Sequence, residues 1–502
     1  MMLVLVLLFA VYFLWRILTY RPDEKSLRLP PCPFGWLPII GHLWRLDAIK
    51  PFETIDFWSR EYGDVFSIFF GSQRVIVISR ARLMREAFLR QADNFSGRPK
   101  LFVHESCWGR GQIISDGAEN AEMRKFLCSC LRQKNGNAPN GIEVVLHREI
   151  AYMNQLIDEK IQRGKNHIDI EETVFYVVGN VLTSFLLGRS YPHGSKEFKQ
   201  NSAWLQRTLD LMHRSAPLTF LPWLRYMPPD GFGYWKMKRQ AAAVHKMMKD
   251  ELLQRIGIHD YKNESRDDLT SLLLRKMEEV RSNDSATEIE KRNFCEDKIA
   301  MLMTELFFAG IQTECNTFGW AFLYFVEYPD VQEKCRQQIL NKFGRQSVVR
   351  WRNRIELPYV EATVMEVQRC ANIAPFSVFH RNYHETTLDG YYIPANSFVM
   401  MNLYSTLVDP NCFQDPYAFK PERFLNHTGE LSFEKMHGLY PYGLGRRICM
   451  GENIARCELF TVICALLQRY RFRKIPGKRY SLEKKMKLTI HPDKYKLLVE
   501  PL

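Results

Sequence analysis

The cysteines of this 502-residue chain form no pattern that binds zinc or builds a disulfide framework. No Cys-x-x-Cys pair occurs, and the lone Cys-x-Cys, Cys128 and Cys130, has no nearby histidine and no second pair. Zinc sites need ligands at regular spacing, and disulfide scaffolds need paired cysteines in a short secreted chain. The 12 cysteines therefore indicate free thiols in a reducing compartment.

Nucleic-acid-binding motifs are also missing. The sequence has no zinc finger, no aromatic RNA-binding motif and no long run of lysine and arginine. The formal net charge is nevertheless +13. An anionic membrane surface or an acidic protein partner explains this excess better than nucleic acid does.

The chain lacks internal repeats and a convincing boundary between two large domains. Its 46% hydrophobic and 13% aromatic residues supply ample material for a core. Long helical periodicities alternate with short strand patterns, so we predict a mainly α fold with small β-sheets. A single folded domain is expected over 42–502.

Residues 1–20 are predicted to be a membrane anchor. They are apolar apart from Arg16 and approach the ~20 residues that a helix needs to cross a bilayer. The basic start and small-residue cleavage site of a removable signal peptide are absent. Basic residues at or after the end of the run favour a cytoplasmic body. The alternative is a buried helix of a soluble protein.

The segment 21–41 is predicted to be a stiff hinge, because its prolines cannot continue a helix and favour extended backbone. Four of them, Pro30, Pro31, Pro33 and Pro38, lie within nine residues. A plain surface loop is the alternative. The apolar, proline-broken stretch 216–224 is a candidate for bilayer contact, or else a buried loop.

Periodicity gives the expected elements of the body. A hairpin is expected from Val65–Phe70 and Gln73–Ile78. Helices are expected over 144–164, 169–188, 195–213, 233–256, 295–327, 330–343 and 358–371. The charged stretch 258–294 is expected to be a surface connection, and 487–498 a strand pair around His491, Pro492 and Asp493.

Cys449 is the first candidate for chemistry. It lies in a glycine-rich turn, 442–451, after two arginines and before a helical run. A helix N-terminus and nearby cations lower a thiol's pKa, and glycines allow a flat cofactor to approach the backbone. A single thiolate without zinc-type partners suits an axial ligand of haem iron. An ordinary buried cysteine is the alternative.

Two further groups of residues indicate a function only when they are considered together with Cys449. Glu366 and Arg369 have helical i, i+3 spacing, and Arg423 after Pro421 could complete a buried clamp; each could instead be surface charge. Gly310 and Thr313 lie inside the predicted long helix, where glycine costs up to ~1 kcal/mol relative to alanine. A ligand approaching Gly310, with the Thr313 hydroxyl bonding in a locally widened turn, would suit a dioxygen pocket. A packing glycine is the alternative.

Together these features resemble the cytochrome P-450 family of haem-thiolate monooxygenases, over essentially the whole chain and in the family's order and spacing. The stretches 95–99, 357–359 and 380–381 are most similar to the animal microsomal class with steroid- and drug-oxidising members. The resemblance implies a helix-rich prism with haem b between the long central helix and the helix after Cys449.

The resemblance also implies roles for individual residues. Cys449 would be the axial ligand of the iron. The cofactor would be held by Arg98, Arg124, His380, Arg447, Gly445 and Gly451. The core on the thiolate side would be locked by Glu366, Arg369 and Arg423. The catalytic oxygen pocket would contain Gly310, Gln312 and Thr313. Substrate would contact Phe308, Ala309, Ala374, Phe376 and Val378, with Phe102 and Thr489 closing the site.

The implied partners are a small lipophilic substrate, the lipid bilayer and an NADPH-dependent flavoprotein reductase, with cytochrome b5 as an optional partner. NADPH would act only through the reductase. The implied location is the endoplasmic reticulum membrane, with the catalytic domain cytoplasmic. A basic docking face for the reductase is predicted at Lys125, Arg132, Lys134 and Arg446.

Three positions depart from the family's pattern. Tyr442 replaces a phenylalanine and adds a hydroxyl that needs a partner. Asn120 replaces a tryptophan, so one propionate contact is lost. Gln312 replaces an acid, and an amide cannot relay protons by titrating. Glu305 and Glu314 are possible substitutes, although helical spacing puts neither on quite the same face.

Other functions stay open at this point. One is a haem-thiolate isomerase or dehydratase that does not use a reductase, which Gln312 supports. Others are a non-catalytic haem-binding sensor or carrier and a membrane scaffold without haem. The sequence does not distinguish steroids, fatty acids and foreign compounds as substrates.

Overall fold

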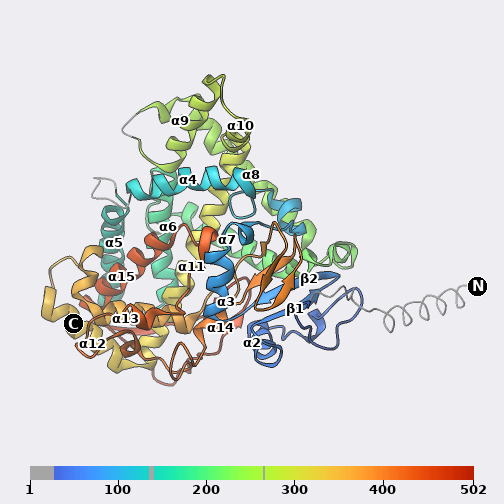
Figure 1. The fold of residues 1–502 in the computed structure, drawn as a ribbon. Coiled ribbons are helices and arrows are strands. Elements are labelled where there is room, and N and C mark those ends of the chain that lie inside the picture. Colours follow the sequence, from blue (N-terminus) through green and yellow to red (C-terminus); the bar gives the residue numbers. More distant parts are fainter. Residues whose placement is uncertain (1–27, 135–140, 264–265) are drawn as a thin grey trace, which may run out of the picture.

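The structure is a computed structural model that describes residues 28–134, 141–263 and 266–502 (Figure 1). The predicted anchor and the first part of the predicted hinge lie outside these residues. The helices are α2 (Pro51–Tyr62), α3 (Ala81–Arg85), α4 (Gly117–Lys134), α5 (Ile142–Gln162), α6 (Ile170–Leu187), α7 (Lys196–Ser215), α8 (Tyr234–Gly257), α9 (Leu269–Ser282), α10 (Glu288–Asn293), α11 (Glu296–Glu327), α12 (Pro329–Phe343), α13 (Pro358–Ala371), α14 (Leu403–Leu407) and α15 (Glu452–Arg469).

The strands are short and form separate small sheets. They are β1 (Val65–Phe70), β2 (Gln73–Ile78), β3 (His167–Ile168), β4 (His380–Arg381), β5 (Thr386–Leu388), β6 (Tyr391–Ile393), β7 (Phe398–Met401), β8 (Tyr470–Arg473), β9 (Lys485–Met486), β10 (Ile490–His491) and β11 (Leu497–Pro501). The mainly α fold with small sheets is therefore confirmed.

Helix α11 is the axis of the helical part (Figure 1). Its 32 residues contain no proline, and acidic residues in the first turn favour its N-terminus. Pro329 follows and favours termination, since the residue before proline avoids helical backbone. Phe318, Trp320 and Phe325 are fully buried. Burying one such side chain stabilises the fold by roughly 1.5–3 kcal/mol.

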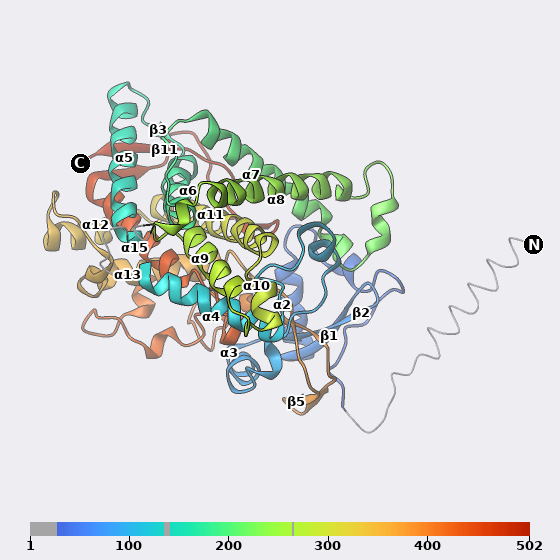
Figure 2. The same cartoon turned by 90° about the horizontal axis from the view of Figure 1, so that it is seen from above.

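Helices α5, α6, α13 and α15 share one hydrophobic core with α11. By length and composition, α6 could cross a membrane, with a mean hydropathy of 1.3. However, 72% of it is buried against its neighbours, so it serves as a core helix. On another side of α11, α7 and α8 lie next to each other (Figure 2).

The largest sheet has the order β1-β2-β7-β4. The hairpin β1–β2 has the predicted bounds, and β7 pairs with β2 in parallel. Arg381 on β4 donates its backbone N–H to the Gly97 carbonyl at 2.8 Å. This bridge brings the segment 95–99 next to His380, although about 280 residues separate them in the chain.

The predicted helices agree with the structure to within a few residues, but two other predictions are wrong. The stretch 258–294 contains α9 and α10, and α9 buries Leu273 and Leu274 in the main core. The turn of the C-terminal strand pair was expected at 491–493. In the structure β9 pairs with β10, so the turn lies at 487–489. Strand β11 pairs instead with β8 and β3.

Candidate functional site

The Cys449 turn is fixed by a close approach between two backbone segments. Gly445 has φ +75°, and a Cβ there would lie 2.0 Å from the Phe88 carbonyl oxygen. Only glycine fits this position. The Cys449 N–H donates to the Tyr442 carbonyl at 3.0 Å, and α15 begins just beyond the turn, at Glu452. The thiol therefore sits at the entrance to a helix, as the sequence predicted.

Cys449 is exposed although α15 behind it is part of the core. Protein on its other sides still raises the pKa of its thiol by desolvation, while the Gly451 N–H and the Arg124 charge lower it. Ala309 is similarly exposed on the largely buried α11. Open side chains on buried helices fit residues that contact a flat, largely apolar cofactor.

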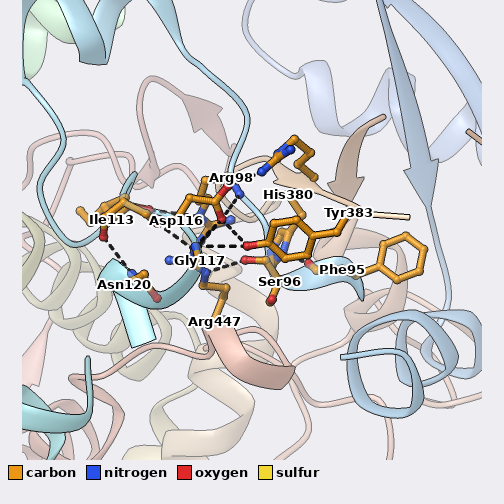
Figure 3. A network of polar contacts seen from close by, with 12 residues as sticks. Phe95, Ser96, Arg98, Ile113, Asp116, Gly117, Asn120, His380, Tyr383 and Arg447 are labelled. Carbon is orange, nitrogen blue, oxygen red and sulfur yellow. Dashed lines mark hydrogen bonds and ion pairs between the residues drawn. The ribbon is translucent and has the colours of Figure 1, made fainter. Parts of the chain in front are cut away.

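A cluster of buried cations lies on the 95–99 side of the site (Figure 3). The Arg98 guanidinium donates to the carbonyls of Val378 and Phe379 at 2.8 Å and of Ile113 at 3.1 Å. Arg447 donates to the carbonyls of Ser96 and Ser115 at 2.8 Å. Neutral carbonyls therefore accept the hydrogen bonds that both guanidinium groups donate here.

One carboxylate, Asp116, contributes negative charge to the group in Figure 3. It accepts hydrogen bonds from the Tyr383 hydroxyl and the Arg381 guanidinium, and its Oδ1 lies 3.5 Å from Arg447. Burial favours its protonated form, but the bonds from Tyr383 and Arg381 keep the pKa of Asp116 below its ordinary value. No pattern in the sequence indicates this residue.

Positive charge exceeds negative charge in this cluster. Burial lowers the pKa of Arg98 to about 9 and that of Arg447 to about 10, and in each case a neighbouring arginine adds to the effect. An anionic ligand would offset the free-energy cost of keeping these buried guanidinium groups charged. The side chains present therefore fit the carboxylates of a haem.

Arg124 and His380 complete the predicted set of cofactor contacts. Arg124 donates to the Ile448 carbonyl, next to Cys449, and burial lowers its pKa. His380 is buried, and its Nδ1 lies 2.9 Å from the Phe95 carbonyl. Desolvation and then Arg98 hold the pKa of His380 well below its ordinary value. An anion beside this imidazole would raise that pKa again.

Asn120 takes a local role where the family carries tryptophan. Its Nδ2 donates to the Gln112 carbonyl at 2.8 Å and to Ser115 Oγ at 3.0 Å. These bonds hold the loop before α4, which also carries Asp116.

Glu366, Arg369 and Arg423 come together in a buried ion-pair network. Arg369 donates to both Glu366 oxygens at 2.7 and 2.8 Å, and Arg423 Nε donates to Oε1 at 2.9 Å. The Glu366 and Arg369 side chains are 0% and 1% exposed. This is the bidentate geometry expected of a rigid clamp, and its predicted role stays a prediction.

Tyr442 finds a partner for its additional hydroxyl. Gln368 Nε2, on α13, lies 2.6 Å from that oxygen. The departure from phenylalanine therefore links the Cys449 turn to α13.

Helix α11 is continuous through Thr313, so the expected widened turn is wrong. The Thr313 hydroxyl donates to the Ala309 carbonyl at 2.7 Å within regular α-helix. A Cβ on Gly310 would meet Leu182 Cδ2 on α6 at 2.8 Å. Close packing of α6 and α11 thus accounts for the glycine, whatever else it does.

Gln312 takes part in a series of side-chain hydrogen bonds that the sequence did not indicate. It accepts from Gln206 on α7 at 3.1 Å and donates to Asn316 at 2.7 Å. Asn316 in turn donates to Thr489 Oγ1 at 2.8 Å. The structure therefore joins two predicted site residues, Gln312 and Thr489, through Asn316.

The two nearby acids point elsewhere. Glu305 accepts the Ile113 N–H at 3.1 Å, and burial raises its pKa to about 7. Burial and Glu458 on α15 raise the pKa of Glu314 well above its ordinary value. Neither contacts Gln312 through a hydrogen bond among the described residues.

The predicted substrate contacts form two groups. The Phe308 ring lies 5.4 Å from Trp108 and 5.3 Å from Trp204, between ring centroids, and both tryptophans were missed. Phe102 instead stacks on Tyr234 of α8 at 5.7 Å. Among the other predicted contacts, Val378 is exposed, while Ala374 and Phe376 are half-buried. No sequence signal separated these tryptophans from ordinary core aromatics.

Comparison with known proteins gives the family. The family model "Cytochrome P450" matches residues 30–499. The chain belongs to the cytochrome P450 family. This P450 is 29% identical over 484 residues to cytochrome P450 1A1 of Felis catus, covering 93% of this chain and 90% of the relative. It is 31% identical over 513 residues to human cytochrome P450 2U1, covering 95% and 90%.

Human cytochrome P450 1A2 is a further relative, 28% identical over 488 residues, with 95% and 92% of the two chains covered. Membership confirms the predicted reaction class and cofactor. This P450 is a monooxygenase, an oxidoreductase that incorporates molecular oxygen, and its cofactor is haem b.

Proposed function

We propose that this P450 is a membrane-bound haem-thiolate monooxygenase that inserts one oxygen atom into a small lipophilic substrate. Electrons would come from NADPH through a flavoprotein reductase, with cytochrome b5 as an optional partner. The observation that supports this most is the open Cys449 thiol at the start of α15, beside a cation cluster with excess positive charge.

Cys449 would be the thiolate ligand of the haem iron, and the cations would bind the propionates. Haem, when bound, would supply the dioxygen chemistry, which thiolate ligation promotes. Gly445 would let the turn approach the Phe88 backbone, and the Gly451 N–H would favour the thiolate of Cys449. The propionate contacts would be Arg98, Arg124, His380 and Arg447. The buried Glu366, Arg369 and Arg423 network would keep this side of the core rigid.

The chain's own residues would then place the substrate and deliver protons. Phe308 and Ala309 on α11, with Ala374, Phe376 and Val378 after α13, would present apolar surface to the substrate. Phe102 and Thr489 would close the site. Thr313 offers a hydroxyl, and Gly310 would contribute only backbone to the oxygen pocket, because its side without a Cβ packs against Leu182. Gln312 cannot carry a proton by changing charge. Proton delivery would therefore be slow relative to an enzyme with an acid there.

Residues 1–20 would anchor the protein in the endoplasmic reticulum membrane, with 21–41 as hinge and 42–502 as a single cytoplasmic catalytic domain. Exposed apolar residues support a bilayer-facing side. Phe34 is 89% exposed in the hinge, and Tyr226 is 70% exposed after the stretch 216–224. Exposed large apolar groups favour contact with lipid.

The reductase would dock on a basic face made by Lys125, Arg132, Lys134 and Arg446. Lys125, Arg132 and Arg446 are exposed, and the Lys134 side chain lies outside the described part of the chain. Such a face steers an acidic partner.

Turnover by the full-length protein, purified with its haem, tests the proposal. The assay combines NADPH, a microsomal flavoprotein reductase, isotopically labelled dioxygen and a panel of steroids, fatty acids and drug-like compounds. We expect one labelled oxygen atom in the product of at least one class. NADPH-independent conversion of a fatty-acid hydroperoxide, with no labelled product, would favour the isomerase or dehydratase alternative that Gln312 supports. Haem binding without either reaction would favour a sensor or carrier.

A further inference from the structure

The amides around Gln312 connect three separate elements. Gln206 lies on α7, Gln312 and Asn316 lie one turn apart on α11, and Thr489 lies in the turn between β9 and β10. The donor–acceptor distances along this chain are 3.1, 2.7 and 2.8 Å. All are in the normal range for hydrogen bonds. These three bonds, from Gln206 through Gln312 and Asn316 to Thr489, form a hydrogen-bond chain. It spans the α11 face from α7 to the β9–β10 turn.

A second contact joins the same two outer elements. Lys487, in the β9–β10 turn, lies 3.0 Å from Asp210 on α7. Asp210 follows Gln206 by one helical turn, so both residues face the same way. The turn is tied to the body as well, because the Ile490 N–H donates to the Ile373 carbonyl at 2.8 Å. Helix α7 thus contacts this turn directly through the exposed Asp210–Lys487 pair and contacts α11 through Gln206.

The hydrogen-bond chain borders the proposed substrate contacts. Phe308 precedes Gln312 by one turn of α11 and lies 5.3 Å from Trp204, which is close to Gln206 on α7. The gap between α7 and α11 is therefore apolar at Phe308 and polar at Gln312.

An amide suits the central position because it donates and accepts at once. Gln312 accepts from Gln206 and donates to Asn316. A carboxylate only accepts, so a glutamate here would need the Asn316 amide to turn over. Asn316 Nδ2 could then donate to the glutamate while its oxygen accepts from the Thr489 hydroxyl. Leucine, of similar size, can do neither.

We propose that Gln206, Gln312, Asn316 and Thr489 form a latch that holds α7 and the β9–β10 turn against α11. The latch slows the passage of ligands to and from the space beside Phe308. This deepens the proposed function and rests on it, because that function places substrate against Phe308. It gives Gln312 a positioning role that is independent of proton delivery.

Ligand release and amide hydrogen exchange test the latch. Full-length holoprotein in lipid nanodiscs is loaded with 4-phenylimidazole, and its dissociation is followed by stopped-flow absorbance. A neutral hydrogen bond stabilises by about 0.5–1.5 kcal/mol, so we expect Gln206→Leu and Gln312→Leu to speed release about two- to tenfold. Both should also speed exchange in peptides from α7 and 485–491. The double variant should release no faster than Gln312→Leu.

Two controls isolate the hydrogen-bond chain. Gln240 on α8 donates to Thr208 on α7 at 3.3 Å, outside the chain, so Gln240→Leu should leave release unchanged. Gln312→Glu should stay close to wild type through the turned Asn316 amide. The latch is overturned if Gln206→Leu and Gln312→Leu release the ligand at the same rate as Gln240→Leu. It is also overturned if Gln312→Glu releases the ligand as fast as Gln312→Leu.

Failure of the latch and failure of the proposed function are separable. An enzyme that oxidises substrate with unchanged release and exchange in the leucine variants lacks only the latch. A holoprotein without turnover, but with faster release in those variants, keeps the latch and loses the proposed function.

Discussion

Removing the Arg369 guanidinium should strongly destabilise the fold. Glu366 is 0% exposed and accepts from Arg369, from Arg423 and from the Lys420 N–H at 2.8 Å. Arg369 also donates to the carbonyls of Leu407 and Pro416, so it pins the segment before Arg423. Breaking a buried pair leaves an uncompensated charge and costs about 3–5 kcal/mol.

The test compares Arg369→Met with an exposed pair. Arg90 lies 2.8 Å from Glu86 and is 79% exposed, and breaking such a pair costs about 0–1 kcal/mol. Urea unfolding of the holoproteins, followed by tryptophan fluorescence, should give a much lower midpoint for Arg369→Met than for Arg90→Met. Arg369→Lys keeps the charge without the bidentate geometry and should fall between them. Equal midpoints for the two methionine variants would refute the reasoning.

Three further outcomes are expected. If proton delivery limits the enzyme, Gln312→Glu raises the ratio of product formed to NADPH consumed, and an unchanged ratio counts against a relay at this position. Lys125→Glu with Arg132→Glu raises the reductase concentration needed for half-maximal turnover; an unchanged titration curve would exclude this docking face. Burial raises the pKa of Glu305 to about 7, so the native state binds this proton more tightly than the unfolded state. Its contribution to stability is present below about pH 4.5 and is lost as pH rises through 7. Glu305→Gln should therefore flatten the decrease in the free energy of urea unfolding between pH 5 and 8. The same slope of unfolding free energy against pH in both proteins would contradict this assignment.

Local patterns predicted those parts of the fold and site that local physics determines. The hairpin β1–β2 follows from two strand patterns around Gly71 and Ser72, and the long helix α11 follows from its periodicity and from Pro329 just beyond its end. The i, i+3 spacing of Glu366 and Arg369 likewise predicts a pair on one helix face. Arg423 joins them only through the tertiary fold, and here the family resemblance supplied what spacing could not.

The missed features depend on contacts between distant segments. Asp116 looks like an ordinary turn residue before α4, and only the fold brings Arg381 and Tyr383 to it. Gln206 and Asn316 have no special spacing relative to Thr489. In 258–294, abundant charge on the outer helix faces obscured the buried leucines of α9. A pattern limited to one segment carries no information about such partners.

The most direct test of the account is the ferrous–carbon monoxide difference spectrum of the full-length holoprotein. Cys449→Ser should abolish the band that is characteristic of thiolate ligation. Cys128→Ser should retain it, although Cys128, like Cys449, lies close to Arg124. A Cys449→Ser protein that binds haem and keeps the thiolate band would contradict the assignment of Cys449 as the iron ligand.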